Sequence, residues 1–422
     1  MLNEVLDKLH IVEPKALQIT TDSRNCPQGS VFFGLKGDRF DGNQYAEQAI
    51  INGASLVVVD NPKAVCCITP DKYLLVNDSL LALQTLAREW RERLNIPIIG
   101  ITGTNGKTTT KELTSAVLQQ KYCIHYTQGN LNNQIGVPLT LLQLNTSHEM
   151  AIVEMGASHP GDIKELVEIA ESQFGLITNI GKAHLLGFGS IDGVRRTKGE
   201  LYDYLRNHNG TAFLNTNDTT LCTMAYDLPT IPYLDGSVIS CDPTLTMTVG
   251  NKQVQTHLIG AYNADNIRAA ITIGLHFGIS LDDCINAIEH YVPTNNRSML
   301  KQTNKNTIIV DAYNANVSSM TAALESIAHS GVSDKTLILG DMLELGDVSI
   351  AEHQGMVDKI NALGFKDVYL VGENFGQTTN TYKCFESTDK LAQYLTKQPI
   401  THRTILLKGS RGMKLETLIP FL

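Results

Sequence analysis

The segment Ile101-Thr-Gly-Thr-Asn-Gly-Lys-Thr-Thr-Thr110 constrains the fold more than any other part of the sequence. The apolar run Ile96–Ile101 before it is typical of a buried strand, and the pattern of Lys111–Gln120 after it is helical. A strand, a glycine-rich turn and a helix N-terminus together form a phosphate-binding loop, because backbone N–H groups and the helix dipole face the anion. Lys107 can then contact terminal phosphates, and Thr108 can hold magnesium. We therefore expect the chain to bind ATP or GTP.

The glycines of this loop are closer together than in the standard motif, in which four residues separate the first glycine from the Gly-Lys pair. Here only two residues, Thr104 and Asn105, separate Gly103 from Gly106, and the next glycine upstream, Gly100, lies one residue too far away. The alternative is a Gly-Lys-Thr sequence that falls by chance in a surface turn, and it does not explain the flanking strand and helix. The predicted nucleotide-binding residues of the loop are Gly103, Thr104, Asn105, Gly106, Lys107, Thr108 and Thr109.

Length and charge limit the classes of protein to consider. A chain of 422 residues divides into about two to four domains of usual size. The formal net charge of -9 argues against a nucleic acid as partner, since a polyanion is repelled except at a local basic patch. A small anionic substrate is compatible with this charge.

The cysteine pattern and the absence of targeting signals predict a cytoplasmic protein. The eight cysteines show neither a Cys-x-x-Cys pair nor the spacing of metal ligands, which fits a reducing compartment. The first residues lack the basic and apolar regions of a signal peptide. No apolar run approaches the length of a membrane span, so we expect no membrane insertion.

Strand and helix patterns alternate along most of the chain, which predicts an α/β fold with three domains. Residues 1–95 predict a small N-terminal domain that ends in a helix with apolar positions from Leu83 to Leu94. Residues 96–298 predict a doubly wound central domain with the phosphate-binding loop and a hairpin over Thr244–Leu258. Residues 299–422 predict a smaller Rossmann-like domain without the Gly-x-Gly-x-x-Gly fingerprint.

Three titratable residues of the central domain are candidates for a site at the carboxyl ends of its strands, where doubly wound folds bind ligands. Glu154 ends the strand Ala151–Met155, and a carboxylate there can hold magnesium. His184 lies four residues beyond Ile180; a single histidine is more often a packing residue, but this position favours a functional role. Lys198 lies among arginines on a predicted helix, and by itself this pattern indicates a solvated residue.

Polar residues further along the chain are also candidates. Asn263 suits the N-cap of an amphipathic helix, whereas Asn266 is unfavourable one turn into that helix and is expected to make a side-chain contact. Asp311 follows a strand, where its carboxylate can bind a ribose hydroxyl or form a turn.

Together these motifs resemble the Mur ligases of peptidoglycan synthesis. The segments that carry the resemblance occur in the family's order and are Thr102-Gly-Thr-Asn-Gly-Lys-Thr-Thr109, Gly129-Asn-Leu-Asn-Asn-Gln-Ile-Gly-Val-Pro138, Glu154-Met-Gly-Ala157, Asn179-Ile-Gly-Lys-Ala-His184 and Lys198-Gly-Glu200. Three further segments resemble the family members that add D-alanyl-D-alanine, namely Asp311-Ala-Tyr-Asn-Ala-Asn316, Gly340-Asp-Met-Leu-Glu-Leu-Gly346 and Lys408-Gly-Ser-Arg-Gly-Met413. Near the N-terminus, the sequence resembles the UDP-sugar-binding region of these members at Thr21-Asp-Ser-Arg24, Gly29-Ser-Val-Phe-Phe33 and Gly42.

This resemblance implies an ATP-dependent amide ligase that joins D-alanyl-D-alanine to UDP-N-acetylmuramoyl-tripeptide through an acyl phosphate. That reaction is the last cytoplasmic step towards the muramoyl-pentapeptide precursor. The resemblance also implies a requirement for Mg²⁺ and a monomeric enzyme.

The resemblance further implies roles for individual residues. Catalytic positions are matched by Lys107, His184 and Lys198, and metal positions by Thr108, Glu154, His184 and Lys198, the last as a carbamylated lysine. Positions that contact adenine, phosphate or ribose are matched by Asn179, Asn266, Arg297 and Asp311. The expected substrate-binding residues are Ser23, Arg24, Gly42, Asn132, Asn133, Asn314, Lys408, Ser410 and Arg411.

Three alternatives are open at this point. Another amide ligase of the same superfamily could add the third amino acid, but such an enzyme is expected to carry an Asp-Asn-Pro-Arg segment, which does not occur here. A folylpolyglutamate synthetase lacks a uridine-binding region like residues 20–42. A catalytically silent nucleotide-binding protein is disfavoured because Lys107, Glu154, His184 and Lys198 occur together.

Overall fold

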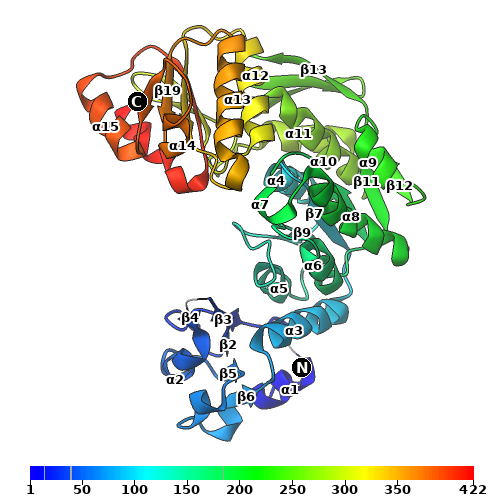
Figure 1. The fold of residues 1–422 in the computed structure, drawn as a ribbon. Coiled ribbons are helices and arrows are strands. Elements are labelled where there is room, and N and C mark those ends of the chain that lie inside the picture. Colours follow the sequence, from blue (N-terminus) through cyan, green and yellow to red (C-terminus); the bar gives the residue numbers. More distant parts are fainter. Residues whose placement is uncertain (14, 39, 184) are drawn as a thin grey trace.

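The structure, a computed structural model, describes residues 1–13, 15–38, 40–183 and 185–422, and of Leu185 only the backbone. Figure 1 shows three parts, each with helices around a sheet, that follow one another in chain order along an arc. The three larger sheets of these parts are parallel except for one edge strand, which confirms the predicted α/β fold class. No helix among the described residues combines the length and apolar character that crossing a membrane requires.

The N-terminal part is built on a parallel sheet with the strand order β1-β2-β5-β6. The side chains of β2 and β5 are fully buried, as expected for the inner strands of a sheet covered on both faces. A short antiparallel pair, β3 and β4, lies beside this sheet. The elements are α1 (Leu2–Leu9), β1 (Ile19–Thr20), β2 (Val31–Phe33), β3 (Lys36–Gly37), β4 (Phe40–Asp41), η1 (Gly42–Tyr45), α2 (Ala46–Ile51), β5 (Leu56–Val59), η2 (Pro62–Val65), η3 (Pro70–Lys72), β6 (Tyr73–Leu75) and α3 (Ser79–Leu94).

Helix α3 joins the N-terminal part to the central part. It begins where the Asp78 side chain accepts the N–H of Leu81, and it ends at Asn95 in a left-handed conformation. Trp90 is fully buried and donates a hydrogen bond to the carbonyl of Leu144 at 3.0 Å. The apolar core of the N-terminal sheet continues across α3 into the central part, so these two parts share one core.

The central part has a parallel six-stranded sheet with the order β12-β11-β10-β7-β9-β8. Because β7 lies between β10 and β9, the loop after β7 meets the carboxyl ends of both neighbours. The elements are β7 (Ile98–Thr102), α4 (Lys107–Leu118), β8 (Ile124–Tyr126), α5 (Gly136–Leu142), β9 (Met150–Glu154), α6 (Asp162–Ala170), β10 (Phe174–Ile177), α7 (Leu185–Phe188), α8 (Ile191–Asn207), β11 (Thr211–Leu214), α9 (Thr219–Met224) and β12 (Thr230–Pro232).

An antiparallel sheet and two helices complete the central part. The predicted hairpin is present as β14 and β15, and β13 adds a third strand to it. Val238 and Ile239 of β13 are both exposed, so this strand lacks the apolar alternation that reveals a strand in a sequence. The elements are β13 (Gly236–Cys241), β14 (Thr244–Val249), β15 (Lys252–Ile259), η4 (Ala261–Asn263), α10 (Ala264–His276) and α11 (Leu281–His290).

The C-terminal part has a six-stranded sheet with the order β16-β17-β21-β18-β19-β20, and only β16 is antiparallel to its neighbour. Helix α12 begins with a capping box between Asn316 and Ser319. The apolar clusters on the two faces of this sheet are separate from the core of the other parts, apart from Ile259. The elements are β16 (Met299–Gln302), β17 (Thr307–Asp311), α12 (Val317–His329), β18 (Lys335–Gly340), η5 (Gly346–Val348), α13 (Ser349–Ala362), β19 (Val368–Val371), α14 (Glu373–Gly376), β20 (Lys383–Phe385), α15 (Thr388–Lys397), β21 (Thr404–Lys408), η6 (Arg411–Met413) and η7 (Leu415–Phe421).

Candidate active site

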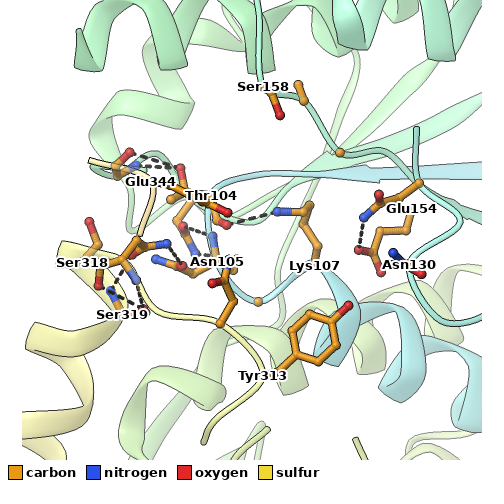
Figure 2. Close-up of a pocket in the computed structure, with 18 of the residues that line it drawn as sticks. Thr104, Asn105, Lys107, Asn130, Glu154, Ser158, Tyr313, Ser318, Ser319 and Glu344 are labelled. Atoms are coloured by element: carbon orange, nitrogen blue, oxygen red, sulfur yellow. Dashed lines mark hydrogen bonds between the residues drawn. The ribbon is translucent and has the colours of Figure 1, made fainter. Parts of the chain in front are cut away.

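A cavity of about 950 Å³ lies between the central and C-terminal parts. The loop between β7 and α4 forms one wall of this cavity, and Tyr313, Asn316 and Arg411 belong to the opposite wall. Figure 2 shows the labelled side chains of Lys107, Glu154 and Tyr313 around this space. The cavity is large enough for a nucleotide and part of a second substrate.

Two glycines of the loop are required by its geometry. Gly103 has a φ of 138°, and a Cβ at this position would lie 2.0 Å from Oγ1 of Thr178. Gly106 has a φ of 83°, and a Cβ there would lie 2.6 Å from Oδ1 of Asn266. Any other residue would therefore strain the backbone and clash with a neighbouring strand or helix. The shortened glycine spacing is a feature of the fold of this loop.

The loop is fastened to the segment after β10. The N–H of Asn105 donates to Oδ1 of Asn179 at 3.0 Å, and the Asn179 amide donates back to the Asn105 carbonyl at 3.0 Å. Thr104 exchanges hydrogen bonds with Gly181, donating to its carbonyl at 3.3 Å and accepting its N–H at 2.9 Å. Asn179 thus lines the cavity, but its side-chain amide group is hydrogen-bonded to the loop.

Lys107 lies across the mouth of the loop. Its ammonium donates to the carbonyls of Gly103 and Thr104 at 2.7 and 3.1 Å. The pKa of Lys107 is lowered overall, chiefly by burial and further by the charge of Arg297. The carboxylates of Glu154 and Glu344 act in the opposite direction and offset part of this shift. An ammonium held in partial isolation from solvent interacts strongly with an incoming anion.

Glu154 and Thr108 lie side by side at the end of β9. The Thr108 hydroxyl lies 3.1 and 2.9 Å from the two carboxylate oxygens of Glu154. Asn132 donates to Glu154 at 2.9 Å, and the Lys111 ammonium lies 3.7 Å from the same carboxylate. A hydroxyl and a carboxylate are the oxygen donors that Mg²⁺ prefers, so these residues fit the ion. Among the described residues, no group of three or more His, Cys, Asp or Glu could hold a metal.

Lys198 is buried, contrary to the surface position that its surroundings in the sequence indicate. Its side chain on α8 is 2% exposed, and its ammonium lies 5.4 Å from the centre of the Phe188 ring. Burial lowers the pKa of Lys198 to about 7, and the charge of Lys107 contributes to this shift. Near neutral pH a large fraction of this amine is therefore uncharged and nucleophilic. The predicted metal and catalytic residue His184 lies outside the described residues.

Asn266 makes the side-chain contact that its helix position predicts. It lies in α10 and lines the cavity. Its oxygen accepts the hydroxyl of Thr110 at 3.0 Å, and its amide donates to Asn263 at 2.9 Å. Asn263 occupies the N-cap position of α10, as predicted, but its side chain makes no capping hydrogen bond; its amide instead donates to the Ile259 carbonyl. Thr109, also predicted in this region, is buried.

The wall from the C-terminal part contains two arginines around one ring. The guanidinium of Arg297 lies 3.8 Å from the centre of the Tyr313 ring, and that of Arg411 lies 5.1 Å from it. Arg411 also donates to the Tyr313 hydroxyl at 3.1 Å. Within the described residues neither arginine forms an ion pair, and both line the cavity. Asn314 lines the same wall.

Other predicted residues of this wall have partners within the protein. The Lys408 ammonium pairs with Asp311 at 2.5 Å, and the Lys408 side chain is 2% exposed. Ser410 accepts the N–H of Leu343 at 3.0 Å. In the central part, Asn133 accepts the N–H groups of two residues at the start of α5, of which that of Gly136 lies at 2.9 Å.

The predicted residues of the N-terminal part do not line this cavity. Arg24 is exposed and pairs with Asp22 at 2.8 Å, which lowers the pKa of Asp22 to about 2. Ser23 is buried, and its carbonyl accepts the Asn52 amide at 2.7 Å. At Gly42 a Cβ would lie 2.6 Å from the Leu35 carbonyl, so a side chain is excluded there.

The two walls of the cavity are in direct contact. The Asn316 amide donates to the side-chain oxygen of Asn105 at 2.8 Å, and Ser318 accepts the N–H of Lys182 at 2.9 Å. Lys182 also forms an exposed ion pair with Glu352 at 2.9 Å. The sequence motifs contain Asn316 and Lys182 but do not reveal that Asn316 contacts Asn105 or that Lys182 contacts Ser318.

Lys111 is a residue of the site that the sequence did not single out. It is 1% exposed and donates to the Thr127 carbonyl at 2.7 Å, beside Glu154. Its position four residues after Lys107 places it on the same helix face, and this spacing was the only signal available.

Comparison with known proteins agrees with this geometry. Three family models match the chain: the Mur ligase family catalytic domain over residues 17–91, the Mur ligase middle domain over 101–274 and the Mur ligase glutamate ligase domain over 296–411. The UDP-N-acetylmuramoyl-tripeptide–D-alanyl-D-alanine ligase of Bacillus subtilis is 35% identical over 95% of this chain and 92% of its own. The chain belongs to the Mur ligase family.

Solved structures of this family are also similar over the whole chain. The crystal structure of MurF from Acinetobacter baumannii covers 100% of this chain and 98% of its own, with a TM-score of 0.88 and 29% identity. MurF from Thermotoga maritima, solved in complex with ADP, covers 98% of this chain and 97% of its own, with a TM-score of 0.86 and 25% identity. The likeness therefore extends to all three parts and to their arrangement.

Proposed function

We propose that this chain is an ATP-dependent ligase that joins D-alanyl-D-alanine to UDP-N-acetylmuramoyl-tripeptide. The observation that carries the proposal is one cavity lined by the phosphate-binding loop, by Glu154 and by Arg411, which forms no ion pair with any described residue. A nucleotide and an anionic amino-acid substrate can therefore meet there. The Bacillus subtilis relative carries the name of this ligase, and its 35% identity favours this activity over other amide ligases of the superfamily.

The reaction joins a carboxylate and an amine in two steps. An oxygen of the terminal tripeptide carboxylate attacks the γ-phosphorus of ATP, and ADP leaves. The amine of D-alanyl-D-alanine then attacks the acyl-phosphate carbonyl, phosphate leaves and one proton is released. Lys107 offsets the negative charge that gathers on the γ-phosphate, which is the main barrier to attack by a carboxylate.

Thr108 and Glu154 would hold Mg²⁺, with Lys111 and Asn132 orienting the carboxylate. When bound, the ion neutralises phosphate charge and fixes the γ-phosphate for in-line attack. The contacts between the cavity walls at Asn105 and Lys182 would help to keep water away from the acyl phosphate, which water would otherwise hydrolyse.

Lys198 is proposed to be carbamylated. Its neutral amine adds to CO₂ with loss of one proton, which leaves a carboxylate at the end of the side chain. The pKa of about 7 supports this step, because only the uncharged amine is nucleophilic. The carbamate and His184 would contribute to a second magnesium position.

The remaining roles follow the family resemblance. Asn179 and Asn266 are proposed to contact adenine, Arg297 a phosphate and Asp311 the ribose. Ser23, Arg24 and Gly42 are proposed to bind the UDP moiety, and Asn132, Asn133 and Asn314 the peptide. Of Lys408, Ser410 and Arg411, the last is proposed to meet the carboxylate of D-alanyl-D-alanine. The charge of Lys408 is paired with Asp311, whereas the hydrogen-bond partner of Arg411 is the neutral hydroxyl of Tyr313.

The domain limits 1–95, 96–298 and 299–422, a monomeric state and a cytoplasmic location also belong to this proposal. The experiment that tests the function is phosphate release from ATP by the purified protein. Release should require both UDP-N-acetylmuramoyl-tripeptide and D-alanyl-D-alanine. If a single amino acid supports release and the dipeptide does not, the proposed reaction is wrong.

A further inference from the structure

The linker between α11 and β16 contains a residue that lines the cavity, Arg297, and the residues on either side of it have an unusual backbone conformation. Arg297 lies between Asn296, with a φ of 56°, and Ser298, with a φ of 49°. A left-handed serine is uncommon and costs conformational energy, so the surrounding structure has to hold it in place. This linker also joins the central part to the C-terminal part.

One side of the linker is fastened to α4, the helix that begins at the phosphate-binding loop. The two carboxylate oxygens of Glu112 each lie 2.9 Å from the amide nitrogen of Asn295. The Tyr291 hydroxyl donates a short hydrogen bond to the same carboxylate. Burial and the neighbouring Glu112 raise the pKa of Tyr291, so its hydroxyl remains a donor at any physiological pH.

The other side of the linker is fastened next to the nucleotide cavity. Ser298 is buried, and its hydroxyl lies 3.1 Å from both the Tyr262 hydroxyl and the Asn263 amide nitrogen. Its N–H donates to Asp311 at 3.3 Å. Arg297 is thus placed between two fastened ends.

Arg297 itself is held by a ring and not by an ion pair. Its guanidinium stacks on Tyr313, and within the described residues its Nε is buried without a hydrogen-bond partner. It lines the same cavity as Lys107 of the phosphate-binding loop, and its charge contributes to lowering the pKa of that lysine. A buried guanidinium nitrogen without a partner is costly, and an anion in the cavity would supply one.

We infer that Glu112 is a positioning residue, which fastens the linker to α4 and so holds Arg297 in place for a nucleotide phosphate. The inference rests on the proposed function, because it assigns the anion at Arg297 to ATP. Glu112 makes no contact with the cavity; it acts through Asn295 and Tyr291. The same contact ties the phosphate-binding loop to the linker between the two parts.

The test uses Glu112→Gln and Tyr291→Phe in the full-length protein. Glutamine has one side-chain oxygen where Glu112 has two, so it cannot accept hydrogen bonds from Asn295 and Tyr291 as the carboxylate does. Phenylalanine lacks the hydroxyl that Tyr291 donates to Glu112. Glu289→Gln and Tyr122→Phe are matched controls, because these residues also tie elements together but do not touch the linker. Glu112→Gln should lower kcat/KM for ATP about tenfold and leave KM for D-alanyl-D-alanine unchanged. Tyr291→Phe should have a smaller effect of the same kind, and the controls none.

A double-mutant cycle separates positioning from a general loss of stability. Arg297→Ala alone should lower kcat/KM for ATP about a hundredfold, and adding Glu112→Gln should change it less than twofold further. A further tenfold loss in the double variant would mean that Glu112 does not act through Arg297, and the inference would fail. A loss that is equal for all three substrates and follows the melting temperature would also overturn it.

Binding of a non-hydrolysable ATP analogue, measured by calorimetry, distinguishes this inference from the proposed function. If the wild-type protein shows no phosphate release with D-alanyl-D-alanine, the proposed function fails. The double-mutant cycle of Glu112→Gln and Arg297→Ala is then measured with the affinity for the ATP analogue in place of kcat/KM. If Glu112→Gln then binds the analogue as tightly as wild type does, the positioning role is wrong as well.

Discussion

The two walls of the cavity are built in different ways. The wall from the central part lies at the carboxyl ends of neighbouring strands. There hydrogen bonds of 3.0 Å join the loop to Asn179, and one of 2.9 Å joins Thr108 to Glu154. The wall from the C-terminal part meets the central part through polar contacts, in which Asn316 bonds to Asn105 of the loop and Ser318 bonds to Lys182. One wall is thus part of a continuous core, and the other rests against it.

This difference separates two tasks. A ligase that makes an acyl phosphate needs fixed charges around the phosphates, and a sheet edge inside a shared core holds them with little freedom. Entry of substrates and release of products require the cavity to open, and a wall attached by few polar contacts can move. Changes on the first wall should therefore affect the chemical step, whereas changes on the second should affect substrate binding and closure.

The largest effect is expected from Lys107→Met. Loss of the ammonium should lower kcat by about a thousandfold, because this group lies at the loop itself and would offset the charge of the γ-phosphate. The melting temperature should not fall, since burial lowers the pKa of Lys107 and an apolar side chain avoids that desolvation cost. Phosphate release and thermal unfolding measure the two quantities, with the exposed Lys164→Met as control. If Lys107→Met retained a tenth of the wild-type activity, the phosphates of ATP would have to bind away from Lys107.

Lys198→Ala should lower kcat about a hundredfold if the lysine carries a carbamate. A small carboxylate such as formate should restore part of the activity, because it supplies the oxygen atoms that the carbamate would provide. In wild type, activation by bicarbonate should increase as the pH rises through about 7, since the amine must lose its proton before it reacts. An alanine variant with full activity, or no rescue by any small carboxylate, would contradict the carbamate.

The nucleotide wall could be predicted from the sequence because its residues follow each other closely in strand, loop and helix. The loop needs glycine where a Cβ would clash, and Glu154 ends a strand that must neighbour β7 in a doubly wound sheet. Local pattern and general topology were sufficient for these residues. The predicted residue His184 lies outside the described part of the chain.

The sequence could not predict burial or pairing across the chain. Lys198 and Lys111 are as polar as any surface lysine, and only the packing of α8 and α4 removes them from water. Lys408 and Arg411 lie three residues apart, yet one is paired with Asp311 and the other faces the cavity. Such differences arise from contacts between residues about a hundred positions apart, for which a local motif contains no information.

Arg411→Ala tests the binding role of the C-terminal wall. KM for D-alanyl-D-alanine should rise about tenfold, the value of one charged hydrogen bond to a carboxylate, while KM for ATP stays within twofold. Steady-state kinetics with each substrate varied in turn measures the difference, and the exposed Lys390→Ala serves as control. Equal losses for both substrates would show that Arg411 supports the cavity as a whole.

The smallest effect is expected where the two walls touch. Ser318→Ala removes the acceptor of the Lys182 N–H and should lower kcat/KM about fivefold, the value of one neutral hydrogen bond. Lys182→Ala keeps that N–H and removes only an exposed ion pair with Glu352, so its effect should stay below about twofold and vanish at high salt. Because Ser318 lies in the first turn of α12 without capping it, the melting temperature of Ser318→Ala should match wild type. If Lys182→Ala proved the more damaging of the two, charge attraction would hold the C-terminal wall in place, and closure would depend on ionic strength more than on the geometry of α12.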